Sequence, residues 1–138
     1  MSLENRALVW KGMEEILNRK RTGLIETIYT PYCHGHSPDG PFRTRDGFRA
    51  LIDRYLTAFP DLHVDIQSMI DQDDWVAMHY TFVGTNNGPL GIFPATGRTL
   101  TLSCFVVTRI EGDRIVEQNF MWDSLNGRCQ LRSQALAA

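Results

Sequence analysis

The period of the apolar residues changes near Phe59-Pro60, and this change restricts what the chain can fold into. Before it, apolar residues recur every three or four positions, the spacing of one face of a helix. After it, apolar and polar residues alternate, as in a strand with one buried face. Helices followed by a series of strands predict an α+β fold.

Three helical segments are expected in the first part of the chain. The strongest covers residues 45–58, with Thr44 as its N-cap and Pro60 ending it. Residues 24–29 predict a short helix, and residues 33–42, "CHGHSPDGPF", read as a loop because they are rich in Gly and Pro. The first helix buries Val9, Met13, Ile16 and Leu17; the third buries Phe48, Leu51, Ile52, Tyr55, Leu56 and Phe59.

Four strands are expected in the second part, over residues 62–70, 75–85, 98–110 and 115–125. In the first strand, Leu62, Val64, Ile66, Ser68 and Ile70 are predicted to share the buried face. Tight turns suggest a meander that forms a curved antiparallel sheet, with the helices packed on its concave face. Since three helices do not fill such a face, a concave small-molecule site is expected.

Composition limits the class of protein. The 138 residues suffice for one domain, 1–138, and the 43% hydrophobic fraction is typical of a folded chain. The formal net charge of −2 and the scattered bases predict no nucleic-acid partner. The sequence has no membrane-length apolar run, no signal-like start and only three dispersed cysteines, so we expect a cytoplasmic protein without a membrane partner.

The outer face of the predicted sheet is mixed in character. It is expected to carry His63, Met69, Trp75, His79 and Phe105. This face is too polar for a core and too apolar to be wholly solvated, which predicts a homodimer formed through it.

Several motifs occur in a specific order: Phe59-Pro60-Asp61, Gly84-Thr85, Thr96-Gly97-Arg98, and Asp123 followed by Leu125. Together they resemble the SnoaL-like polyketide cyclases (ester cyclases) of the NTF2-like superfamily, from about residue 27 to residue 131. The resemblance implies an α+β cone, a dimer, and a ring closure that needs no cofactor and no metal. It also implies that an Asp on the last strand is the base, a position that Asp123 matches.

The chain departs from many relatives at Gln118-Asn119, where they have His-Trp, and at Asn86, where they have His. If Asn119 faces inward, the pocket is larger than theirs and carries an additional amide.

Asp123 is the candidate catalytic residue. On an ideal strand it shares a face with Asn119 and Met121, and an apolar surrounding would raise the pKa of the carboxyl toward that of a working base. The alternative is that Asp123 is exposed at the strand end or caps the following turn. Asn119 and His36 are candidate hydrogen-bond donors to the substrate; His79 is expected to face away. Tyr55, Phe59, Tyr80 and Trp122 are candidate lining residues.

Three functions remain open. The first is a cofactor-independent cyclase in which Asp123 removes a proton from a small hydrophobic substrate bearing carbonyl groups. The second keeps the fold but changes the reaction to a double-bond isomerase or an epoxide hydrolase. The third is a ligand-binding or dimerisation module without turnover. No metal is expected, because His34 and His36 lack further ligands at a suitable spacing.

Overall fold

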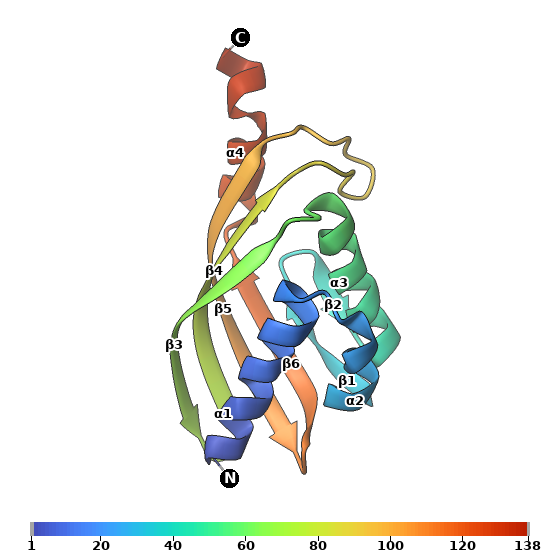
Figure 1. Ribbon diagram of the computed structural model, residues 1–138, viewed down its shortest axis with the longest axis vertical. Coiled ribbons are helices and arrows are strands. Elements are labelled where there is room, and N and C mark those ends of the chain that lie inside the picture. Colours follow the sequence, from blue (N-terminus) through green and yellow to red (C-terminus); the bar gives the residue numbers. More distant parts are fainter. Residues whose placement is uncertain (1, 138) are drawn as a thin grey trace.

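One curved six-stranded sheet forms the body of the protein, and the helices α1, α2 and α3 lie against one side of it (Figure 1). The computed structural model describes residues 2–137. The strands run in the order β2-β1-β6-β5-β4-β3 across the sheet, and β1 pairs with β6 in parallel while the other pairs are antiparallel. Their bounds are Tyr29–Ser37, Gly40–Phe42, His63–Gln72, Trp75–Thr85, Thr99–Glu111 and Arg114–Trp122, for β1 to β6. The predicted α+β cone is confirmed. Its sheet is mixed, whereas the sequence predicted an antiparallel one.

The helices form where the apolar stripes predicted them. Helix α1 (Ser2–Lys11) continues as a π-helix (Gly12–Asn18), and a 3-10 turn (Thr22–Leu24) leads into α2 (Ile25–Ile28). Helix α3 (Arg45–Ala58) starts at the predicted N-cap, where the Thr44 hydroxyl accepts a hydrogen bond from the Gly47 amide at 3.1 Å. Its predicted stripe is confirmed, with Phe48 and Ile52 buried in the core.

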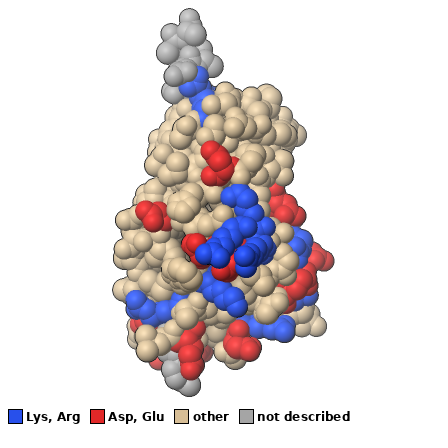
Figure 2. All heavy atoms as spheres, viewed as in Figure 1, with Lys and Arg blue, Asp and Glu red and all other residues tan. Residues whose placement is uncertain are grey.

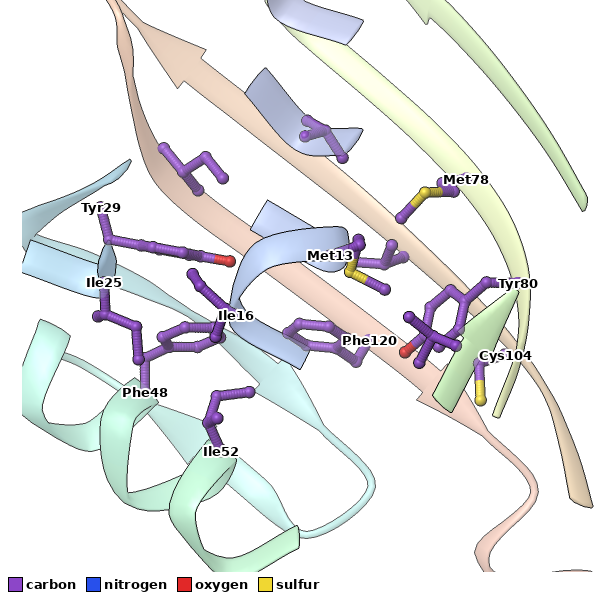
Figure 3. Close-up of a cluster of buried hydrophobic side chains, with 14 of the residues drawn as sticks. Met13, Ile16, Ile25, Tyr29, Phe48, Ile52, Met78, Tyr80, Cys104 and Phe120 are labelled. Carbon is purple, nitrogen blue, oxygen red and sulfur yellow. The ribbon is translucent and has the colours of Figure 1, made fainter. Parts of the chain in front are cut away.

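The core lies between α3, the π-helix and the concave face of the sheet. Figure 3 shows it as a continuous apolar layer in which Tyr29 and Phe48 stack and Phe120 lies beside them. The ring centroids of Tyr29 and Phe48 are 4.2 Å apart. Tyr80 and Cys104 face the same interior from neighbouring strands.

A β-bulge in β3 overturns part of the predicted alternation. Ile66 pairs with Tyr80 and Ser68 with His79, so Gln67 has no partner across the ladder. The extra residue exchanges the two faces for the rest of the strand. Ile70 is therefore 70% exposed rather than buried, and Met69 packs against the core instead of lying on the convex face.

The loop prediction for residues 33–42 was also wrong. These residues form most of the β1–β2 hairpin, whose turn is Pro38-Asp39, with Gly40 at a φ of +120°. The Pro-Asp-Gly sequence is a typical turn signal, and it joins two strands here. Gly35 allows β1 to approach β6, because a Cβ at this position would lie 1.8 Å from the Gln118 carbonyl oxygen.

The last strand is shorter than predicted. It ends at Trp122, and residues 124 and 125 belong to α4 (Ser124–Ala137), which stands at one end of the sheet (Figure 1). Helix α4 covers the start of β5, the part of that strand that does not pair with β6. The Gln130 amide completes the backbone hydrogen bonding there, donating to the Thr101 carbonyl at 2.8 Å and accepting from the Thr101 amide at 2.9 Å.

Two of the sequence motifs meet at the end of α3. The Asp61 carboxylate accepts hydrogen bonds from the amide and the hydroxyl of Thr85, both at 2.7 Å. These two bonds hold the pKa of Asp61 below its usual value, and the bond from the amide has the larger effect. Gly84 lies directly against Phe59. These motifs therefore join helix to sheet, which is a structural role.

Charges of both signs are interspersed on the face shown in Figure 2. The basic run Arg19-Lys20-Arg21 is exposed, and Arg19 and Arg21 form ion pairs with Glu15. None of the described helices is long and apolar enough to cross a membrane.

The close contact at Gly35 gives a stability prediction. Gly35→Ala should lower the free energy of unfolding by about 3 kcal/mol or more, because its methyl group would push against the backbone of β6. Gly23→Ala is the matched control, since a Cβ there meets nothing within 4 Å. Urea denaturation measures both variants, and equal stabilities would contradict the close approach.

Candidate functional site

An apolar cavity opens between α3, the π-helix and strands β3 to β6. About 540 Å³ of space not filled by atoms lies within its bounds, part of it open solvent at the mouth. Concave, mostly apolar cavities with a few polar groups are typical of small-molecule sites. Its walls are formed by Leu17, Leu51, Ile52, Tyr55, Leu62, Val64, Tyr80, Phe82, Leu100, Leu102, Cys104, Phe120 and Trp122.

Tyr80 and Cys104 bring polar atoms to this wall. They are direct partners across the β4–β5 ladder, and the Cys104 thiol donates to the Leu102 carbonyl at 3.8 Å. Burial raises the pKa of the Tyr80 hydroxyl well above its usual value and that of the Cys104 thiol to about 12. Both groups are therefore protonated at neutral pH. The phenol is a suitable hydrogen-bond donor to a ligand oxygen.

Tyr55 supplies a further polar group, from α3. Its hydroxyl donates to Oδ2 of Asp39 in the β1–β2 turn at 2.5 Å. Burial first, and then this hydrogen bond, raise the pKa of Tyr55 well above its usual value. The phenol therefore stays neutral and links the cavity to a carboxylate.

Aromatic rings form much of the inner surface. Trp122 packs edge-on against Tyr55, with centroids 5.6 Å apart, and Phe59 stands edge-on to Phe82 at 5.4 Å. Tyr55, Tyr80 and Trp122 thus line the cavity, as expected from the sequence. Phe59 is fully buried behind the wall, where it supports Tyr55 and Phe82.

The structure places the other candidates outside the cavity. Asn119 pairs with Val107 and with His36, on the face opposite Phe120 and Trp122. The Asn119 amide oxygen accepts from the His36 amide at 3.1 Å, and its nitrogen donates to Glu117 at 3.0 Å. The sequence analysis considered that Asn119 could face inward. The structure corrects this, because side chains alternate along β6 and Asn119 points to the face opposite Phe120 and Trp122.

Asp123 also differs from its expected surroundings. It is exposed and follows the last residue of β6, so it does not share a strand face with Met121. Its Oδ1 accepts a hydrogen bond from the Asn126 amide at 2.9 Å, and its carbonyl accepts from Gly127. This is the geometry of an N-cap of α4. The observed placement of Asp123 is the one given by the alternative interpretation, in which it caps the following segment. The role of Asp123 in catalysis stays a prediction.

Sequence analysis missed Gln118, which is the inward polar residue of β6. It is 2% exposed and accepts from the Tyr29 hydroxyl at 2.7 Å while donating to Thr108 at 3.0 Å. Its partners satisfy it within the core, so it joins β1, β5 and β6. The period of two that places Phe120 and Trp122 inward could have identified it.

His79 faces outward as expected, stacked on Phe105 with centroids 4.6 Å apart and hydrogen-bonded to Ser103. Among the described residues, no three His, Cys, Asp or Glu side chains gather closely enough to hold a metal ion. His34 lies 3.7 Å from Glu117 on the outer face.

The cap geometry predicts how Asp123 contributes to stability. Asp123→Ala should lower the free energy of unfolding by about 1 kcal/mol, whereas Asp123→Asn should change it by only a few tenths, because Asn also caps helices. Thermal unfolding of both variants measures the difference. Equal losses in the two variants would argue against the cap.

Burial predicts the reactivity of the thiols. The pKa of Cys33 is raised to about 11 and that of Cys104 to about 12, chiefly by burial, whereas Cys129 is exposed. Since the thiolate is the reactive form, Ellman's reagent at pH 8 should label Cys129 quickly and the other two only after denaturation. Rapid labelling of all three in the native protein would contradict the buried positions.

Comparisons with known proteins agree with this fold. The family model of SnoaL-like polyketide cyclases matches residues 7–131. No curated protein matched the chain.

Several solved structures have the same fold at low sequence identity. A protein from Jannaschia sp. CCS1, named as a SnoaL-like polyketide cyclase, superposes with a TM-score of 0.87 at 15% identity, covering 94% of this chain and 92% of that one. AclR from Streptomyces galilaeus, named as a hydroxylase, gives 0.82 at 24% identity, with 95% and 82% covered. IdmH from Streptomyces antibioticus, named as a polyketide cyclase, gives 0.79 at 22%, with 92% and 97% covered.

Proposed function

Since the chain belongs to the SnoaL-like polyketide cyclase family, we propose that it is a cyclase. Its substrate is a small, largely apolar molecule that carries carbonyl groups, and the product is closed by a bond between two of its carbons. The observation that carries this proposal is the apolar cavity with Tyr80 among its lining residues. The wall selects apolar surface, and the phenol selects an oxygen acceptor.

The proposed reaction needs a base and a donor but no cofactor. Removal of a proton beside a carbonyl gives an enolate, and the Tyr80 hydroxyl donates a hydrogen bond to its oxygen. The cavity then holds the enolate carbon near an acceptor carbonyl. Positioning of this kind can supply much of the rate, because the reaction joins two parts of one molecule.

For the base, the sequence predicts Asp123. Its neighbour Trp122 lines the cavity, which supports a place near the substrate, while its exposure and its hydrogen bond to Asn126 support the cap role. Asp123→Asn separates the two roles, since the amide preserves the cap but cannot accept a proton. If Asp123 is the base, turnover should fall by about 10²–10⁴-fold without a change in melting temperature.

The experiment is a screen of polyketide-like esters and small enones with mass spectrometry of the products. We expect a product of unchanged mass, or of a mass reduced by water, and its formation should fall about 10- to 100-fold in Tyr80→Phe. Products without ring closure would contradict the proposal. Unchanged turnover in folded Asp123→Asn would remove Asp123 from the mechanism.

An isomerase is the second candidate, because a buried tyrosine hydroxyl is a strong donor to a developing enolate. In the screen, it would shift the double bond of an enone without forming a ring. An epoxide hydrolase is less well supported, since it needs several polar groups around one water and the wall is mostly aliphatic and aromatic. A binding module would retain ligands without converting them.

We also propose a homodimer formed through the convex face of the sheet. Its exposed side chains include Trp75, Phe105, Val107 and Met121, the last 64% exposed. Light scattering should give twice the chain mass at micromolar concentration, and Phe105→Glu with Val107→Lys should give the monomer mass. A monomeric wild type would contradict this assembly.

A further inference from the structure

Helix α4 supports one part of the cavity wall from behind. Its first turn lies against the start of β5, at one end of the sheet (Figure 1). Gly127 of this turn is buried, and a Cβ placed on it would meet the side chains of Leu100 and Leu102. Both leucines line the cavity. Their side chains therefore border the ligand space and also the backbone of Gly127.

A small space remains between this glycine and the leucines. A Cβ on Gly127 would lie 3.6 Å from Cδ1 of Leu100 and 3.7 Å from both methyl carbons of Leu102, which is ordinary van der Waals contact. One methyl group would thus fit here without displacing a neighbour. Gly35 is different, because the same atom there would lie 1.8 Å from a carbonyl oxygen. The space at Gly127 is therefore available to the leucine side chains.

The backbone of α4 does not require a glycine at this position. Gly127 is not among the described glycines that have a positive φ. A glycine inside a helix lowers its stability relative to alanine, because glycine loses more conformational freedom on folding. A residue that weakens its own helix without a conformational need indicates that the space it leaves has a use.

Helix α4 is held in place beside this space. The Gln130 side chain makes two hydrogen bonds with the backbone of Thr101, which lies between the two leucines in β5. At the start of the helix, the Gly127 amide donates to the Asp123 carbonyl at 3.0 Å. Since the helix is bonded on both sides of Gly127, a ligand that presses on the wall displaces leucine side chains rather than α4.

We propose that Gly127 sets the size limit of the cavity, because the space beside it lets Leu100 and Leu102 turn away from ligands larger than one ring. This proposal rests on the proposed cyclase function and deepens it, since it makes Gly127 a specificity-determining residue for bicyclic substrates. Part of the 540 Å³ within the cavity bounds is open solvent, so the enclosed part is smaller. A second ring therefore needs the space that the leucines yield. A wall packed tightly from behind would accept the additional carbons only with strain.

The test compares two ketones of different size. Cyclohexanone has one ring, and 2-tetralone is an apolar bicyclic ketone. NMR titration gives the dissociation constant of each, and wild type should bind both. Gly127→Ala fills the space with one methyl group, so the affinity for 2-tetralone should fall about tenfold. The affinity for cyclohexanone should stay within about twofold of wild type.

Arg128→Ala is the matched control. Arg128 is exposed and follows Gly127 in the same helix, so its replacement should leave both dissociation constants within about twofold of wild type. Because alanine favours a helix more than glycine does, Gly127→Ala should melt about 3 °C above wild type. A weaker affinity in a more stable protein cannot result from unfolding.

A second substitution tests whether the shared space is the cause. Leu102→Val, added to Gly127→Ala, removes about as much volume from the leucine as the alanine adds. The affinity of the double variant for 2-tetralone should therefore return to within about threefold of wild type. A double variant that binds 2-tetralone as weakly as Gly127→Ala would overturn the proposal.

The outcomes separate this proposal from the cyclase function. Unchanged 2-tetralone affinity in Gly127→Ala overturns the role of Gly127 and leaves the cyclase proposal standing. The expected loss of affinity, without ring closure of any ester in the screen, supports the role of Gly127 and counts against the cyclase. A wild type that does not bind 2-tetralone also overturns the role of Gly127, and the ester screen then decides on the cyclase by itself.

Discussion

The pairing of β4 with β5 determines where the side chains of the site point. This ladder runs without a bulge from the Trp75–Arg109 pair to the Thr85–Thr99 pair. Because side chains alternate along a strand, its uninterrupted register brings Tyr80 and Cys104 together on the concave face and His79 and Phe105 together on the convex face. A slip of one residue would turn the cavity wall outward, so both the cavity and the apolar outer surface depend on this register.

The polar groups of the cavity stand out against the rest of the core. The buried Gln118 has partners on two sides and so resembles an ordinary core hydrogen-bond network. Tyr80, in contrast, lies opposite Cys104 across the ladder, and a thiol is a weak hydrogen-bonding group. A buried hydroxyl with a weak partner costs stability, and such sites are often retained for binding or catalysis. Tyr55 differs again, since it donates to a carboxylate near the surface.

The architecture could be predicted from the sequence because it follows from periodic patterns. The stripe of α3, its Thr44 cap and the residues 75–85 of β4 all appear where the pattern placed them. Elements that depend on one residue could not be predicted in this way. The unpaired Gln67 reversed the faces of β3, and the N-cap role of Asp123 shortened the last strand.

The site was predicted in part, for a related reason. Tyr55, Tyr80 and Trp122 lie on regular elements, so their orientation followed from the period. His36, Asn119 and Asp123 were selected because their chemistry suits the reaction. Pairing between distant strands placed His36 and Asn119 outside the cavity, and Asp123 caps α4. Two of the family motifs, Phe59-Pro60-Asp61 and Gly84-Thr85, join helix and sheet at Thr85.

The central claim is that ligands enter the cavity on the concave side of the sheet. Methyl NMR of the protein titrated with 2-tetralone tests it most directly, because methyl groups line both faces. Shifts confined to the cavity methyls of Leu51, Ile52 and Leu102, with Ile70 and Val107 unmoved, are the predicted result. Shifts confined to the outer methyls would contradict the account.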